Sequence, residues 1–139
     1  MSDCGYVLDT SALLTYIENE EGVEQIERLL LDALDNKTKL FMSVLSALEI
    51  FYISWREQGE AIAEERLTLL QSLPISQEPV ATPLVRIAGN IKARKHLSLA
   101  DACIAGLAKS KNAVLVHKDP EFEQLAKEIT LRPLPYKSQ

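Results

Sequence analysis

The sequence has little of what marks membrane, secreted or disulfide-stabilised proteins. No stretch approaches the ~20 consecutive apolar residues that span a bilayer, so we expect no membrane association. The N-terminus, MSDCGYVLDTS, has no basic segment followed by an apolar one, as a secretory signal requires. Cys4 and Cys103 show neither CxxC nor zinc-site spacing, which favours reduced thiols. We therefore expect a cytoplasmic protein.

Positive charge is not in excess either, because 15 Lys and Arg residues stand against 20 Asp and Glu residues, for a net charge of -5. This argues against a passive binder of phosphate backbones, so a nucleic-acid role would need local basic patches or metal ions. The length of 139 residues and the ordinary composition, 47% hydrophobic and 25% charged, predict one domain over residues 1–139. Repeats and low-complexity tracts are not evident.

Short apolar strands alternate with helical patterns along the chain. The strands are expected at 5–9, 39–43, 74–76, 113–119 and 130–134, and the helices at 11–17, 21–35, 43–59, 60–73, 83–96, 98–112 and 120–129. Such alternation predicts an α/β fold with a parallel sheet and helices on both faces. In these folds function gathers at the carboxyl ends of the strands.

Three apolar segments are each interrupted by one acid. Residues 4–17, 40–55 and 97–108 contain a single charged side chain each, namely Asp9, Glu49 and Asp101, where 25% charged residues would give three or four. An unpaired carboxylate in apolar surroundings is costly or has a shifted pKa. Nothing basic lies within these segments, so we expect a positive group from elsewhere.

A fourth acid, Asp119, follows the strand expected at 113–119, at the same end of its strand as Asp9. Carboxylates gathered in one pocket would repel one another unless a hard divalent cation, Mg²⁺ or Mn²⁺, held them together. Such an ion can polarise a phosphodiester and supply a water-derived nucleophile. The residues alone therefore favour metal-dependent phosphodiester hydrolysis.

Helix capping is the simpler alternative for each acid. Ser46 and Ser98 each stand three residues before an acid, which is the spacing of a capping box. Asp119 precedes Pro120 and Asp9 precedes an expected helix, so both are also suited to an N-cap. The joint placement of the four acids carries more weight than any one motif.

The segments VLDTSAL, SALEI, LSLADACIAGLA and VLVHKDPEF resemble the PIN domain, in order and spacing, over nearly the whole chain. In length and pattern the sequence is similar to VapC-type toxins of toxin–antitoxin pairs. The resemblance implies a PIN-like three-layer α/β/α sandwich with a central parallel sheet, and an Mg²⁺- or Mn²⁺-dependent endoribonuclease. It assigns Asp9, Glu49, Asp101 and Asp119 as catalytic and metal-binding residues. Ser11, and after it Thr10, match hydroxyl positions that hold water or phosphate.

One position departs from the pattern of this family. Where many members have Thr or Ser two residues before the fourth acid, this chain has His117, followed by Lys118. The role of Asp119 is thereby left open. His117 is either a hydrogen-bond donor to phosphate or an ordinary residue at a strand end.

The densest basic cluster, RIAGNIKARKH, lies just before the Asp101 helix. Within it, Lys92 and Arg94 are our candidates for contacts with RNA phosphates, although a solvated helix face is the alternative. Substituting both with alanine tests this hypothesis.

The early helices contain more apolar surface than their lengths require, notably in IERLLLDAL and LEIFYISW. The resemblance implies a homodimer and a separate antitoxin protein that binds across these helices. Two other classes of function stay open. One is a PIN-fold module that binds RNA or protein without catalysis. The other is a phospho-acceptor signalling domain, which fits less well because the strand at 39–43 ends without an acid.

Overall fold

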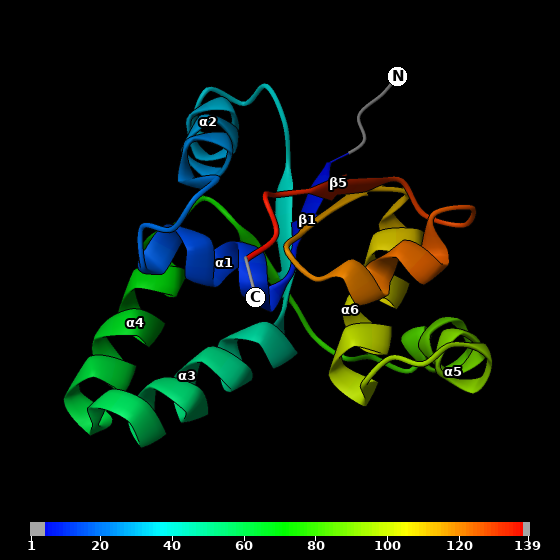
Figure 1. Cartoon of the computed structure of the whole chain (residues 1–139). Helices are drawn as coiled ribbons and strands as arrows, with labels where there is room; N and C mark the ends of the chain where they lie inside the picture. The colour runs from blue at the N-terminus through cyan, green and yellow to red at the C-terminus, as the bar shows by residue number, and fades with distance from the viewer. Residues whose placement is uncertain (1–4, 138–139) are drawn as a thin grey trace.

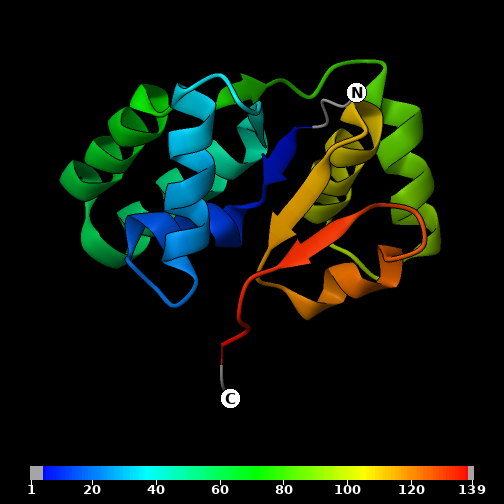
Figure 2. The same ribbon diagram turned by 90° about the horizontal axis from the view of Figure 1, so that it is seen from above.

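The computed structural model describes residues 5–137, which form a five-stranded sheet in the order β3-β2-β1-β4-β5. The strands are β1 (Tyr6–Leu8), β2 (Leu40–Ser43), β3 (Ser76–Glu78), β4 (Val114–His117) and β5 (Leu131–Pro133). Every neighbouring pair is parallel; in β1, Tyr6 lies opposite Leu40 of β2 on one side and Val114 of β4 on the other. The predicted parallel sheet is confirmed, with the first strand at its centre (Figures 1 and 2).

Helices cover both faces of this sheet. On one face lie α1 (Thr10–Ile17), α2 (Val23–Leu34), α3 (Val44–Gln58) and α4 (Glu60–Ser72). On the other lie α5 (Leu84–Arg94), α6 (Leu99–Lys111) and the 3₁₀-helix η1 (Pro120–Leu125). Figure 1 looks along the sheet, with the first group on its left and the second on its right. This is the three-layer α/β/α sandwich that the sequence predicts.

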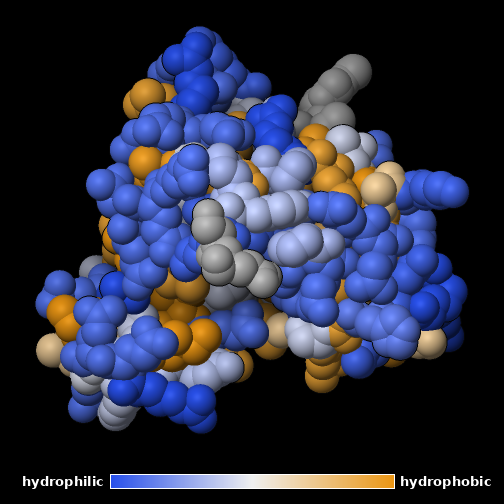
Figure 3. All heavy atoms as spheres, in the orientation of Figure 1, coloured by the Kyte–Doolittle hydropathy of each residue, from blue (hydrophilic) through white to orange (hydrophobic). Residues whose placement is uncertain are grey.

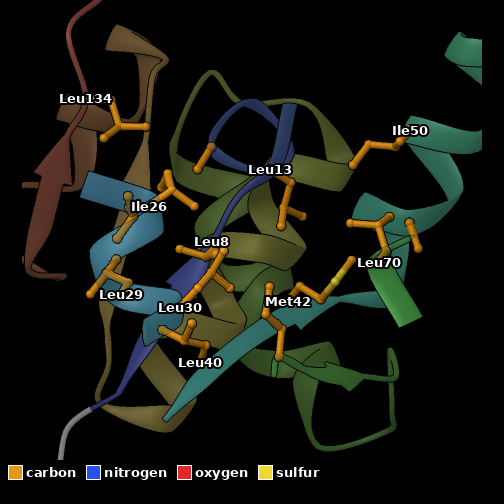
Figure 4. Packing of buried hydrophobic residues seen from close by; sticks show 14 residues of the cluster. Leu8, Leu13, Ile26, Leu29, Leu30, Leu40, Met42, Ile50, Leu70 and Leu134 are labelled. Carbon is orange, nitrogen blue, oxygen red and sulfur yellow. The ribbon is translucent and has the colours of Figure 1, made fainter. Parts of the chain in front are cut away.

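Alternating side chains of the central strands divide the core between the two faces, as the two-residue period of a strand requires. Leu8 and Val116 point into the cluster under α1–α4, which Figure 4 shows from close by. Val7 and Leu115, one residue earlier, point into the cluster under α5, α6 and η1. Because both faces of β1 and β4 are buried, the positions at their ends are closely fixed.

Two elements differ from the prediction. The helix expected at 120–129 is a 3₁₀-helix that ends at Leu125. Phe122 and Leu125 are its fully buried residues, and their spacing of three matches the 3₁₀ period rather than the α period. The third predicted strand lies at 76–78 rather than 74–76. Pro74 has no N–H to give to a ladder, whereas Ser76 pairs with Phe41.

The sheet order makes the gap between β1 and β4 the topological switch point, where successive connections run to opposite sides of the sheet. Ligands of open α/β sheets bind outside the carboxyl ends of the strands at such a point. Within residues 5–137, no helix is long and apolar enough to cross a membrane. Cys103 is a buried free thiol, and Cys4 lies outside the described residues.

Candidate active site

Asp9 lies directly after β1, at the switch point, and is only 2% exposed. Its backbone N–H donates to the Val116 carbonyl at 3.1 Å, which ties it to β4. Its carboxylate accepts the Ala12 N–H at 2.7 Å and lies 2.8 Å, through both oxygens, from the Ser11 Oγ. The predicted N-cap is therefore present, yet it satisfies the carboxylate without neutralising its charge.

Ser11 links the ends of the two central strands. While its hydroxyl donates to the carboxylate of Asp9, its oxygen accepts the backbone N–H of Lys118 at 2.9 Å. The serine thus fixes Asp9 relative to the segment that follows β4. The sequence predicts that Ser11 holds water or phosphate; in the structure its hydroxyl contacts the first acid itself.

Glu49 lies in the second turn of α3 and is half-buried. The Thr10 Oγ1 donates to its Oε1 at 2.7 Å and also lies 3.0 Å from the Ser46 Oγ. The capping-box alternative for Glu49 is wrong, because α3 begins one turn earlier, at Ser43, whose Oγ accepts the Leu45 N–H. Thr10 is therefore a residue that positions Glu49, joining α1 to α3.

Asp101 lies in the first turn of α6 and Asp119 is the N-cap of η1, and the two carboxylates approach each other. Ser98 caps α6 by accepting the Asp101 N–H at 3.1 Å, as the capping prediction states. Asp119 caps η1 by accepting the Glu121 N–H at 2.9 Å, with Pro120 in the first turn. Capping and clustering are therefore compatible, because a cap leaves further carboxylate lone pairs free.

A fifth acid, Glu121, joins these two. Asp101, Asp119 and Glu121 each offer an oxygen within 4.8 Å of the others. Sequence reasoning missed Glu121, since in an α-helix starting at Pro120 an early acid is the ordinary complement of the helix dipole. The two-residue spacing from Asp119 across a proline was the available signal.

None of the ion pairs found within residues 5–137 includes Asp9, Glu49, Asp101, Asp119 or Glu121. The protein thus gathers carboxylates at one edge without a basic partner.

Burial and repulsion between the carboxylates raise the pKa values of two of these acids. Burial, opposed by the hydrogen bonds from Ala12 and Ser11 and assisted by repulsion from Asp101 and Asp119, raises the pKa of Asp9 to about 7. Burial, with repulsion from Asp119 and Glu49, raises the pKa of Asp101 to about 6. Both acids resist ionisation until a positive charge arrives.

This donor set fits a hard divalent cation. All candidate ligand atoms are carboxylate oxygens, which Mg²⁺ and Mn²⁺ prefer over the nitrogen and sulfur ligands of zinc sites. The uncompensated negative charge and the close approach of three carboxylates are what such an ion would relieve.

His117 is fully buried at the end of β4. Its Nδ1 accepts the Asp119 N–H at 3.1 Å, and its ring packs edge-on against Phe122 at 5.2 Å. Burial lowers the pKa of His117, so the imidazole is neutral at pH 7. Lys118 turns away from the acids, and its Nζ donates to the Glu21 carbonyl at 2.7 Å. The structure therefore places His117 as a support for the Asp119 backbone.

Lys92 and Arg94, the residues predicted to contact RNA phosphates, form hydrogen bonds within the protein. Arg94 forms two hydrogen bonds to the carboxylate of Glu128, at 2.8 and 3.1 Å. The Lys92 Nζ donates to the Leu97 carbonyl at 2.8 Å, at the turn that leads into α6. Lys92 is thus near the helix that presents Asp101, while Arg94 is engaged with an acid.

Together these features define a class: a doubly wound α/β domain with a cluster of carboxylates at its topological switch point. Comparison with known families identifies the family to which the chain belongs. The PIN domain family matches residues 6–128, so the chain belongs to the PIN domain family. The search of curated proteins found no match.

Solved structures with the same fold include VapBC2 from Rickettsia felis bound to a promoter DNA fragment, at 17% identity and a TM-score of 0.77, covering 94% of this chain and 98% of that one. DNA-bound VapBC from Salmonella typhimurium has 21% identity and a TM-score of 0.77, with coverage of 94% and 98%. VapC20 from Mycobacterium tuberculosis, a toxin that cleaves the sarcin–ricin loop, has 18% identity and a TM-score of 0.69, with coverage of 93% and 100%.

Proposed function

We propose that this protein is a metal-dependent endoribonuclease and the toxin of a toxin–antitoxin pair. The observation that carries the proposal is the convergence of Asp9, Glu49, Asp101 and Asp119 on the switch point of a PIN domain, without basic partners. The similarity in fold to VapBC complexes and to VapC20 supports the assignment of substrate and partner.

Asp9, Glu49, Asp101 and Asp119 would hold the ion, and Glu121 adds a carboxylate beside Asp101 and Asp119. A bound Mg²⁺ or Mn²⁺ supplies positive charge to the phosphodiester oxygens and lowers the pKa of water at the site. The chain does the positioning: Ser11 holds the Asp9 carboxylate and Thr10 holds that of Glu49. Fixed carboxylates of this kind orient a water for in-line attack.

Lys92 and Arg94 remain our proposed contacts to RNA phosphates. Lys92 lies beside the turn leading into α6, which presents Asp101. Arg94 would have to exchange its contact with Glu128 for a phosphate. Alanine variants of Lys92 and Arg94 should lower RNA affinity and reduce its salt dependence. Lys37 is exposed and precedes β2, at the amino ends of the strands, so Lys37→Ala should change neither.

An exposed apolar row on α3 supports protein partners. Val44, Leu48, Tyr52 and Trp55 are 40% to 56% exposed and recur at helical spacing. Figure 3 shows apolar atoms gathered on this side of the molecule, between α1 and α3. We propose that the early helices bind a separate antitoxin, and that the protein forms a homodimer. Light scattering of the purified protein tests the second proposal.

The central test is cleavage of a structured RNA pool by the purified protein in Mg²⁺, Mn²⁺ or EDTA. We expect cuts with 5′-phosphates in either metal, none in EDTA, and a loss of at least ~100-fold in Asp9→Asn and Asp101→Asn. Glu64→Gln, an exposed acid on α4, is the matched control and should cleave normally. Binding without cleavage in every metal would favour the inactive RNA-binding module instead.

The phospho-acceptor alternative loses its structural basis. Flavodoxin-like signalling domains have the strand order 2-1-3-4-5, whereas this sheet has β1 at its centre in the order β3-β2-β1-β4-β5. Incubation with a phosphodonor should leave the protein unmodified.

A further inference from the structure

A hollow of about 320 Å³ opens beside the acidic edge, between the α1–α2 connection and the segment that follows β5. Ser11 and Asp119 form its inner wall, next to the candidate metal ligands. Leu14 adds an apolar surface, and Tyr136 and Lys137 line the side formed by the C-terminal segment. The volume lies at the lower end of the range for small-molecule sites, ~300–1,000 Å³, which suits one nucleotide.

The C-terminal segment is anchored in this position. The Leu134 N–H donates to the His117 carbonyl at 2.7 Å, and the Leu134 side chain is 2% exposed in the core under α1–α4. The next residue, Pro135, packs on Gly22, where a Cβ would come within 3.0 Å of the proline ring. Figures 1 and 2 both show this segment leaving β5 on the side of α1 and η1. The wall of the hollow therefore exists before any ligand binds.

The aromatic ring at the hollow is also fixed. The Tyr136 hydroxyl donates to the Glu123 Oε2 at 2.7 Å, and the ring lies 6.1 Å from the ring of His117. The side chain is half-buried and lines the hollow. A ring held in this way loses little further freedom when a planar ligand stacks on it.

Ion pairs offset the acids around the hollow, whereas the whole chain has a net charge of -5. Glu18 pairs with Arg66 at 3.3 Å, and Glu20 pairs with both Lys118 at 3.6 Å and Lys137 at 3.0 Å. With Asp119 included, three acids stand against three cations, of which Arg66 lies outside the lining of the hollow. The Lys137 side chain is 70% exposed, and its ammonium group would exchange the contact with Glu20 for one with a phosphate.

We propose that this hollow binds one nucleotide of single-stranded RNA adjacent to the cleaved phosphodiester, with its base against Tyr136 and its phosphate near Lys137. The proposal rests on the proposed ribonuclease function and names a part of the substrate site. Stacking on an aromatic ring accepts any base, so the hollow contributes affinity for unpaired RNA rather than a preference for one sequence.

The test measures binding apart from cleavage. Fluorescence anisotropy with Ca²⁺ in place of Mg²⁺ gives the Kd for a short single-stranded RNA of mixed sequence and for an abasic ribose-phosphate chain of the same length. The wild type should bind the RNA roughly tenfold more tightly than the abasic chain. Tyr136→Leu should remove that difference, and Tyr136→Phe, which keeps the ring and loses the contact with Glu123, should retain it.

Lys137→Ala should lower the affinity for the RNA and for the abasic chain by the same factor, and lower the slope of log Kd against log salt concentration by about 0.7. Lys37→Ala provides the matched control at the amino ends of the strands. Equal affinity of the wild type for RNA and for the abasic chain, or an unchanged difference in Tyr136→Leu, overturns the subsite. If the wild type still cleaves RNA in that case, the ribonuclease assignment stands. Absence of any RNA binding refutes both.

Discussion

Asp9→Asn should make the metal-free protein more stable at alkaline pH, although it removes a proposed metal ligand. The pKa of Asp9 is raised from 3.8 to about 7 in the folded protein. Ionisation therefore opposes folding: the contribution of the protonated carboxyl is complete below pH 3.8 and is lost as the pH rises to about 7. Three pKa units correspond to ~4 kcal/mol, the largest gain that the variant can show.

Asparagine does not ionise, but it replaces one acceptor oxygen with an NH₂ group that faces the Ser11 hydroxyl. That mismatch costs ~1–2 kcal/mol. We therefore expect Asp9→Asn to exceed the wild type by ~2 kcal/mol in unfolding free energy near pH 8 and to fall ~1 kcal/mol below it near pH 4, where the mismatch remains but the ionisation penalty is small.

Urea unfolding in EDTA, followed by circular dichroism between about pH 4 and pH 8, measures this effect. The wild type should lose stability with a slope that is ~1.4 kcal/mol per pH unit steeper than that of the variant, equivalent to one proton. Asp35→Asn, an exposed acid just after α2, is the control and should leave the slope unchanged. A variant that is less stable at pH 8, with the slope of the wild type, would refute this account of Asp9.

Metal binding should reverse the order of stability, so that the wild type becomes more stable than Asp9→Asn. Mn²⁺ at 100 times its Kd stabilises a folded protein by ~2.7 kcal/mol, and the wild type should gain this amount near pH 8. Asp9→Asn should gain far less. Equal gains would show that Asp9 does not contribute to metal binding.

Three further substitutions test individual contacts. Thr10→Val removes the donor to Glu49 and should lower the cleavage rate by ~10-fold while unfolding free energy changes by ~1 kcal/mol; an unchanged single-turnover rate would contradict the positioning role. Phe122→Ala empties a fully buried position beside His117 and should cost ~3–5 kcal/mol in urea unfolding, and a loss below ~1 kcal/mol would speak against the packing described. Arg94 and Lys109 lower the pKa of Glu128 from 4.5 to about 2, so the stability that their contacts add is present above pH 4.5 and disappears as the pH falls to about 2. Because Glu128 is partly exposed, Glu128→Gln should lower the unfolding free energy by only ~1 kcal/mol or less at pH 7. This difference between variant and wild type should vanish in strong acid and shrink in high salt. A loss of stability that depends on neither pH nor salt would exclude an ionic cause.

The sequence predicts the fold, and the gathering of Asp9, Glu49, Asp101 and Asp119 at one edge, because the same residues carry both signals. Asp9 and Asp119 interrupt or end apolar strands, and parallel strands bring their carboxyl ends to one edge. The apolar segments around Glu49 and Asp101 make each acid conspicuous. Burial on both faces of the sheet then leaves little freedom in where the acids lie.

Contacts across long stretches of chain could not be predicted in this way. Thr10 and Glu49 are 39 residues apart, and a hydroxyl beside an acid in sequence gives no sign of which carboxylate it will bind. Glu121 was missed because a 3₁₀ turn and an α turn look alike over six residues. Tyr136 and Lys137 lie in a segment without regular structure, whose path depends on Leu134 finding the core.

The central place of β1 has a consequence for synthesis on the ribosome. The first strand emerges early, but its neighbour β4 is made only after residue 113, and Leu134 completes the core later still. Nearly the whole chain must therefore be synthesised before Asp101 and Asp119 can lie beside Asp9. A nascent or prematurely terminated chain lacks the assembled acidic edge, so the proposed ribonuclease would have no complete site until translation is almost finished.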